Sequence, residues 1–263
     1  MARSRLDAEL VRRGLARSRE AATDLIEARV VLVSGIPATK PATQVDAETS
    51  ISIAEDRNEF VSRGGHKLAG ALAFFGDVKV SGKRALDAGA STGGFTDVLL
   101  RNGASHVIAV DVGYGQLAWE LRQDPRVRIL DRTNVRHLTR EHVGEPVDLV
   151  VADLSFISLT LVLPALVTVT HEMADFLVMV KPQFEVGREK LGAGGVVRDP
   201  ALRLAAIEEV ARSAWESGLG VAGVTASPLP GPSGNVEYFL WLRRGSPELT
   251  RDRAQAAIEQ GPQ

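Results

Sequence analysis

The sequence predicts an α/β protein with a Rossmann-like, mostly parallel sheet of seven strands, helices on both faces, and a small N-terminal α+β domain. From Phe60 onward, short apolar runs alternate with helical segments, which is typical of a parallel sheet covered on both sides. Before Phe60 the elements are shorter and this alternation is missing. An acidic, polar stretch, Glu55–Glu59, separates the two regions. We therefore expect two domains, residues 1–59 and 60–263.

The strands expected in the larger domain are apolar runs separated by helical or turn-forming segments. A polar tail follows from Ser246, where we expect a surface helix or a frayed end. The expected strands are Arg84–Ala88, Val107–Val110, Val127–Leu130, Val147–Ala152, Phe176–Val180, Gly220–Thr225 and Tyr238–Leu242.

The smaller domain is expected to begin with two short helices within residues 6–28. Gly14 suits the end of the first helix, and Ser18 suits the N-cap of the second. The β-branched run Val30–Val33 predicts a strand that Ser34 and Gly35 close. Two further segments are expected to be a loop and a short strand, Pro37–Gln44 and Ile51–Ile53.

Composition excludes several classes of protein. With no cysteine, the chain has no disulfides, thiolate metal sites or cysteine nucleophiles. No apolar run reaches the roughly 18 residues needed to cross a bilayer, and the charged N-terminus lacks the apolar core of a signal peptide. We therefore expect a cytoplasmic protein that uses neither a membrane nor a metal.

Basic residues gather in two places although the formal net charge is −2. The first 20 residues hold six arginines against three acids, and a second basic group surrounds Lys67. Composition alone favours solvated helix faces. A basic cluster is also the electrostatic pattern of nucleic-acid binding. On the nucleic-acid interpretation, which the resemblance given below narrows to RNA, the contact residues would be Arg3, Arg5, Arg12, Arg13, Arg17, Arg19, Arg63 and His66.

A glycine-rich turn follows the first strand of the larger domain. Residues 86–97 read Leu-Asp-Ala-Gly-Ala-Ser-Thr-Gly-Gly-Phe-Thr-Asp, and a helix is expected from about Phe95. Glycines let the backbone approach a ligand closely, while the turn's N–H groups and the helix N-terminus favour a polar or anionic group. The turn therefore predicts a nucleotide-type cofactor.

Details of the turn favour S-adenosylmethionine over a dinucleotide. A dinucleotide turn needs glycine where Ser91 stands. Asp87 would suit an ammonium group and repel a pyrophosphate, and Asp111 can bind ribose hydroxyls. The pattern resembles motif I of the Rossmann-like S-adenosylmethionine methyltransferases. The residues expected to bind the cofactor are Asp87, Gly89, Ser91, Thr92, Gly93, Gly94, Phe95, Asp111 and Asp153.

Four ionisable residues stand where an open α/β sheet places its chemistry, at strand ends or beside them. Asp153 and Lys181 directly follow expected strands, Glu237 directly precedes one, and Lys67 begins a helix. Any one of them alone is more typical of a surface charge. Together, lysines with acidic partners can act on a ribose hydroxyl, as base or by stabilising a developing alkoxide. We therefore expect all four to be catalytic.

The chain resembles the TlyA family, which is called haemolysin-like and understood as ribosomal RNA 2′-O-methyltransferases. The related FtsJ-type enzymes use a Lys–Asp–Lys–Glu tetrad, which maps onto Lys67, Asp153, Lys181 and Glu237. The resemblance implies that Lys181 is central and that cytidines of ribosomal RNA are methylated within ribosomal subunits, on the large subunit and in longer members also on the small one. It also implies a link to capreomycin susceptibility. The matching stretches are Ser62–Leu68, Leu86–Phe95, Asp111–Leu117, Ala152–Ser158, Val180–Glu185 and Gly231–Phe239.

The N-terminal stretch Leu6–Arg19 resembles an S4 RNA-binding domain, in which two helices and a turn present basic residues to structured RNA. Arg29 departs from that pattern, because S4 domains commonly have glycine there. If Arg29 adopts a positive φ, it costs about 1 kcal/mol relative to glycine. The extra charge could instead add an RNA contact.

Three other functions compete with this reading. A membrane lysin would need an exposed amphipathic or spanning element, which the sequence lacks. An inactive RNA-binding protein would be expected to have a damaged cofactor turn or tetrad, and neither is damaged. A methyltransferase for small molecules or proteins would not need the S4-like segment.

Overall fold

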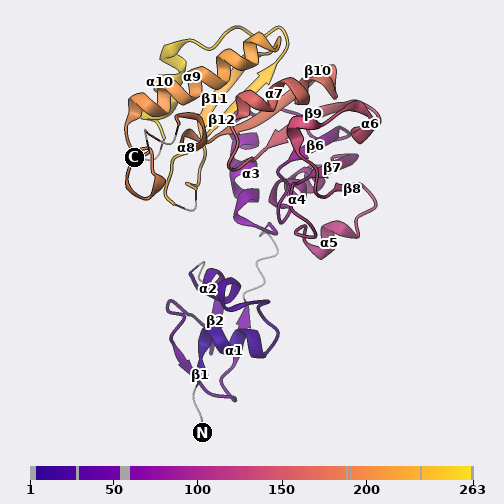
Figure 1. Ribbon diagram of the computed structural model, residues 1–263. Helices are drawn as coiled ribbons and strands as arrows, with labels where there is room; N and C mark the ends of the chain where they lie inside the picture. The colour runs from indigo at the N-terminus through magenta and orange to yellow at the C-terminus, as the bar shows by residue number, and fades with distance from the viewer. Residues whose placement is uncertain are drawn as a thin grey trace. The chain divides into compact units, whose positions relative to one another are not determined.

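The computed structural model describes residues 4–27, 30–53, 60–187, 189, 191–231 and 233–261. The chain divides into two compact units, Met1–Glu59 and Phe60–Gln263, each with its own core (Figure 1). The expected linker Glu55–Glu59 lies outside the described residues, as do Arg3 and Arg29.

The smaller unit packs two helices against short strands. The helices are α1 (Leu6–Arg12) and α2 (Arg19–Glu27), and Ser18 Oγ accepts the N–H of Ala21 at 3.1 Å, as expected for a cap. Leu6, Leu10, Ala22, Ile26, Val31 and Val45 are buried in its core. Its strands are β1 (Ser4–Arg5) paired with β4 (Gln44–Val45), and β3 (Ile36–Pro37), β2 (Val31–Val33) and β5 (Ile51–Ile53) in that order.

The segment Pro37–Gln44 of this unit was expected to be a loop, and this prediction is wrong at both ends of the segment. Pro37 pairs with Leu32 in one sheet, and Gln44 pairs with Arg5 in another. These strands are only two residues long. So short a segment carries no periodicity, and only pairing with another strand identifies it as a strand.

The larger unit is built on one seven-stranded sheet of order β11-β12-β10-β9-β6-β7-β8. β12 runs antiparallel to both of its neighbours, and the other pairings are parallel. This confirms the expected mostly parallel sheet. The strands are β6 (Arg84–Ala88), β7 (His106–Val110), β8 (Val127–Leu130), β9 (Val147–Ala152), β10 (Thr170–Val180), β11 (Gly220–Ala226) and β12 (Tyr238–Arg243).

Helices cover both faces of this sheet because successive strand residues point to opposite sides. In β6, Ala85 belongs to the core beneath α3 (Arg63–Phe75), α4 (Gly94–Arg101) and α5 (Trp119–Arg122). Leu86 belongs to the opposite core, with α7 (Leu163–Thr168), α9 (Pro200–Glu216) and α10 (Arg251–Glu259). The α10 helix confirms the helix expected in the tail. The remaining helical turns are α6 (Arg140–Val143), α8 (Pro182–Glu185), η1 (Val135–His137), η2 (Leu159–Leu161) and η4 (Ala193–Gly195).

The strand order reverses between β6 and β9. The chain passes from β6 outward to β7 and β8, whereas β9 lies on the other side of β6 and leads to β10. Connections that leave neighbouring strands in opposite directions open a crevice at the carboxyl edge of the sheet, and ligands bind there. The glycine-rich turn follows β6 and Asp153 follows β9, so both stand at this point.

Candidate active site

The chain turns from β6 into α4 through two glycines in the left-handed conformation. Gly89 has φ +88°, and a Cβ there would lie 2.6 Å from the carbonyl oxygen of Asp153. Gly93, the N-cap of α4, has φ +100°, and its Cβ would lie 2.3 Å from the Leu121 side chain. Both positions therefore require glycine for conformation and for space.

Two cavities open at this edge and share Gly89, Ser91, Asp153 and Ser155 in their walls. The first cavity has a volume of about 480 Å³ and the second about 270 Å³. The other residues of the first cavity are Val110, Asp111, Val112, Gln116, Asn134, Val135, Leu154, Phe156, Ile157 and Val162. Those of the second are Ser62, Arg63, Gly64, Lys67, Ala90, Thr92, Gly94, Phe95, Lys181 and Pro230.

Asp111 is held at the floor of the first cavity by backbone donors. Its Oδ2 accepts the N–H of Ser91 at 2.8 Å, and its Oδ1 accepts the N–H of Gly113 at 2.7 Å. A carboxylate oxygen has two lone-pair directions, so each oxygen retains capacity for a ligand hydroxyl. The carboxylate therefore presents two fixed acceptors to a ligand in the first cavity.

Asp87 is placed differently from the other acids. It is fully buried beneath the turn, lines neither cavity, and accepts a hydrogen bond from Thr96 Oγ1 at 2.7 Å. Its Oδ1 has no hydrogen-bond partner among the described residues. Burial, with smaller effects of the charges of Asp153 and Asp111, raises the pKa of Asp87 to about 7. The geometry therefore gives Asp87 no direct access to either cavity, and Gly93 likewise lines neither.

The four residues expected to be catalytic form two ion pairs. Lys67 Nζ of α3 lies 2.6 Å from Glu237 Oε2, across 170 residues of sequence, and both side chains are buried. Lys181 Nζ, at the end of β10, lies 2.6 Å from Asp153 Oδ1. Both lysines line the second cavity, whereas Glu237 stands behind Lys67. Two cations, each with its own carboxylate, therefore face one small space.

Ser155 is a site residue that the sequence reasoning missed. Its Oγ accepts a hydrogen bond from Lys181 Nζ at 3.0 Å, and it lines both cavities. Serine is common in loops, so composition gave no signal. Its position two residues after Asp153 was the available clue, because that loop leaves the carboxyl end of a central strand.

The two basic residues expected to bind RNA in the larger unit lie near this site. Arg63 lines the second cavity. His66 is exposed, and its ring meets the ring of Phe60 edge-on at 5.1 Å.

In the smaller unit, four of the expected RNA-binding arginines are held by two buried acids. Asp7 pairs with Arg5 and Arg19 at 3.0 and 2.8 Å. Glu9 pairs with Arg12 and Arg13 at 2.6 and 2.7 Å. Hydrogen bonds from these arginines, above all from Arg5 and Arg12, hold the pKa values of both acids below their usual range.

Two arginines in this unit differ sharply in exposure. Arg13 also donates to the backbone carbonyls of Thr49 and Asp46, so its guanidinium is bound within the fold. Arg17 is exposed. A reversal of charge at both positions would therefore perturb the fold at one and only the surface at the other.

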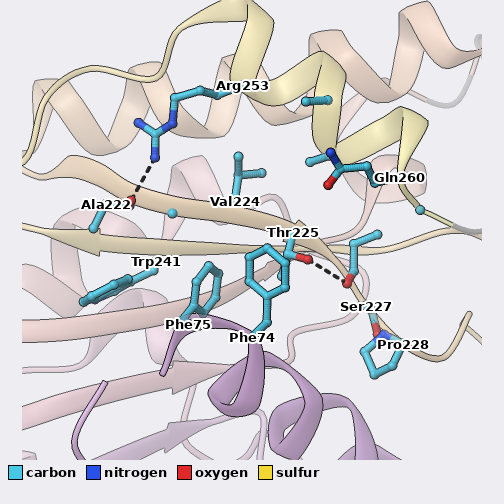
Figure 2. A pocket seen from close by; sticks show the side chains of 15 residues that line it. Phe74, Phe75, Ala222, Val224, Thr225, Ser227, Pro228, Trp241, Arg253 and Gln260 are labelled. Atoms are coloured by element: carbon cyan, nitrogen blue, oxygen red, sulfur yellow. Dashed lines mark hydrogen bonds between the residues drawn. The ribbon is translucent and has the colours of Figure 1, made fainter. Parts of the chain in front are cut away.

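Another cavity, of about 630 Å³, lies elsewhere, along α3, β11 and α10 (Figure 2). Phe74, Phe75 and Trp241 line it, and Arg253 donates to the carbonyl of Ala222 there. None of the residues expected to bind the cofactor, to contact RNA or to be catalytic lines this cavity. The candidate site therefore lies at the strand ends and not in this cavity.

The described residues contain neither a metal-binding cluster nor a membrane-spanning helix. No group of three or more His, Cys, Asp or Glu among them could hold a metal ion. No helix in that part of the chain is both long enough and apolar enough to cross a bilayer.

Known proteins match both units. The family model for FtsJ-like methyltransferases matches residues 60–244, and that for the S4 domain matches residues 4–51. The 16S/23S rRNA (cytidine-2′-O)-methyltransferase TlyA of Mycobacterium tuberculosis is 59% identical over 99% of this chain and 99% of its own length. Hemolysin A of Brachyspira hyodysenteriae is 36% identical over 89% of this chain and 98% of its own.

A solved structure of a hemolysin-named protein from Streptococcus thermophilus is also similar. It is 38% identical, covers 99% of this chain and 96% of its own, and has a TM-score of 0.78. These relatives confirm the resemblance drawn from the motifs. The chain belongs to the TlyA family, in which an S4 domain precedes an FtsJ-like methyltransferase domain.

Proposed function

We propose that this protein transfers a methyl group from S-adenosylmethionine to the ribose 2′-hydroxyl of cytidines in ribosomal RNA. The proposal rests on two ion pairs, Lys67–Glu237 and Lys181–Asp153. The two lysines face one cavity beside the glycine turn. The reaction itself is that of the Mycobacterium tuberculosis relative.

The first cavity and its surroundings suit this cofactor. Asp111 presents two acceptors for ribose hydroxyls, and the glycine turn lets the backbone come close. Two carboxyl groups, those of Asp111 and Asp153, line the first cavity, while Asp87 lies beneath the turn with an orphaned Oδ1. Such a set favours a cation and disfavours a pyrophosphate. When bound, S-adenosylmethionine supplies the electrophilic methyl group.

The chain's own residues would orient and stabilise the attacking oxygen. Lys181 donates to Ser155 and pairs with Asp153, so two of the three directions of its ammonium group are fixed. We assign the third to the ribose 2′-oxygen, whose developing negative charge a lysine in a confined site stabilises. Lys67, fixed by Glu237, adds a second positive charge to the same cavity.

An exposed aromatic ring in the wall of the first cavity supports a nucleotide acceptor. Phe156 is 91% exposed at the mouth of the first cavity, and its ring lies 5.2 Å from that of Phe184. Rings of this kind bind unstacked bases by stacking. The arginine-rich S4 unit would supply contacts to RNA phosphates.

Three finer points belong to the same proposal. The printed activity of the Mycobacterium tuberculosis relative covers 16S and 23S RNA, so we propose both ribosomal subunits as substrates. Such a substrate places the reaction in the cytoplasm. We also propose that loss of these methyl groups lowers susceptibility to capreomycin.

The name of the Brachyspira relative raises membrane lysis as a second function. The arrangement of the exposed apolar side chains does not favour it. Phe156, the most exposed of them among the described residues, lines the first cavity beside Asp153 and Ser155, where a nucleotide acceptor accounts for it better than a membrane does.

The decisive experiment is methyl transfer from labelled S-adenosylmethionine to unmethylated ribosomal subunits, with Lys181→Ala beside the unaltered protein. Primer extension that stops at 2′-O-methyl groups maps the product. Labelled 2′-O-methylcytidine made only by the unaltered protein is the expected result. No transfer by a folded, cofactor-binding protein would refute the proposal.

A further inference from the structure

The two motifs that contain Asp153 and Lys181 continue beyond those residues, to Ser158 and Glu185. The structure joins the two far ends. Glu185 Oε2 accepts a hydrogen bond from Ser158 Oγ at 2.5 Å, and its Oε1 accepts the backbone N–H of Leu159 at 3.0 Å. Both carboxylate oxygens are therefore used on the end of the loop that leaves β9.

The Ser158 hydroxyl stands in the middle of a chain of hydrogen bonds. Its single proton goes to Glu185, so the Thr160 hydroxyl, 2.7 Å away, must donate to Ser158 Oγ. The Thr160 N–H also donates to Ser158 Oγ, at 3.1 Å, and this caps η2. Chains that end on a carboxylate are stronger than neutral ones. Burial raises the pKa of Glu185.

Between its two ends the loop carries residues of the cavity wall. Lys181 holds the start of the loop through Asp153 and Ser155. Phe156 follows with φ +65°, an unfavourable backbone conformation for a residue with a Cβ, and both it and Ile157 line the first cavity. A strained, exposed residue persists only where contacts on both sides hold the backbone.

We propose that Glu185 is a positioning residue that fixes the far end of the Asp153–Ser158 loop to α8 and thereby keeps Phe156 and Ile157 in the wall of the first cavity. The inference rests on the proposed function, which takes this cavity as the S-adenosylmethionine site. Glu185 lines neither cavity, so it acts through the loop. Without its carboxylate, Ser158 and Leu159 lose an acceptor and the strained backbone relaxes.

The test measures the Kd for S-adenosylhomocysteine by calorimetry on the full chain, for Glu185→Ala, Glu185→Gln and the control Glu172→Ala. Glu172 is an exposed glutamate of β10 outside both cavities. We expect Glu185→Ala to weaken binding about tenfold. Glutamine keeps an oxygen for the Leu159 N–H, so it should restore affinity to within about threefold. The control should match the unaltered protein.

A second readout separates positioning from general instability. Because Lys181 keeps both of its own partners, kcat at saturating S-adenosylmethionine should fall less than the affinity does. Unchanged affinity in folded Glu185→Ala, or a glutamine variant as weak as the alanine variant, would overturn the proposal. If Glu185→Ala does not fold, Ser158→Ala removes one donor and should still weaken binding severalfold, and unchanged affinity there would overturn it equally.

Failure of the wider function would look different. An unaltered protein that binds S-adenosylhomocysteine but methylates no ribosomal subunit would refute the proposed reaction. The comparison of affinities among the Glu185 variants would still decide the role of Glu185.

Discussion

Lys67→Ala should cost the protein stability as well as activity. The Lys67 and Glu237 side chains are 8% and 1% exposed, and their charged atoms lie 2.6 Å apart. Removal of the lysine leaves a buried carboxylate without its cation, which costs about 3 to 5 kcal/mol in comparable pairs. Lys181→Ala leaves Asp153, whose side chain is 21% exposed and reachable by water, so its cost should be about 1 kcal/mol.

Thermal unfolding followed by tryptophan fluorescence tests this difference. All three tryptophans, Trp119, Trp215 and Trp241, lie in the larger unit, so the signal reports that unit alone. We expect Tm to fall by about 10 °C in Lys67→Ala and by only a few degrees in Lys181→Ala.

A double variant completes the argument. Lys67→Met combined with Glu237→Gln removes both buried charges and should recover much of the lost stability while methyl transfer stays absent. Equal melting of the two single lysine variants, or a double variant less stable than Lys67→Ala, would refute the reasoning.

Three further outcomes are expected. Ser155→Ala removes one acceptor of Lys181 and should lower kcat at saturating S-adenosylmethionine about tenfold, as loss of roughly 1.4 kcal/mol would; a normal kcat would contradict the assigned contact. The pKa of Asp87 is raised to about 7, so its folded state binds a proton more tightly than the unfolded chain and stability is lost as pH rises toward 7. The Tm of Asp87→Asn should therefore rise relative to that of the unaltered protein as pH increases from about 4 to 7, and the difference should persist above pH 7. Curves of Tm against pH that run parallel for the two proteins would contradict the raised pKa of Asp87. Arg17→Glu should weaken RNA binding and reduce its salt dependence by about one counterion without a change in melting by circular dichroism, whereas Arg13→Glu should also destabilise the smaller unit; equal effects of both on melting would show that the described contacts of Arg13 contribute nothing.

Most of the sheet could be predicted because each strand is a local apolar run. Six of the seven expected strands agree with the structure to within one residue at either end. The exception is β10, which begins at Thr170 and not at Phe176. Its first part includes the exposed residues His171 and Glu172, and only pairing of Thr170 with Val147 makes it a strand. Periodicity cannot report a strand whose residues are mostly in water.

Part of the candidate site could likewise be predicted from the sequence, and part could not. Glycine conformation and strand-end position are local properties, so the turn at Gly89 and the residues Asp153 and Lys181 could be found from the chain alone. Asp87 shows the limit, because an acid beside a cofactor turn can face the ligand or lie buried under it. The structure buries it against Thr96. The burial of Asp87 depends on how α4 packs on the sheet, which cannot be predicted from a local sequence pattern.

By itself, the sequence determined the fold class, the family and the residue types of the candidate chemistry, because these follow from patterns within a few residues of one another. Only the tertiary structure decided which lysine pairs with which carboxylate, that Ser155 contacts Lys181 and Glu185 contacts Ser158, and that four of the five arginines described in the smaller unit are bound to buried acids. Those contacts join residues distant in the chain. Their geometry is set by packing of the whole sheet and its helices, and a side chain's neighbours across such a distance are fixed only when the core has formed.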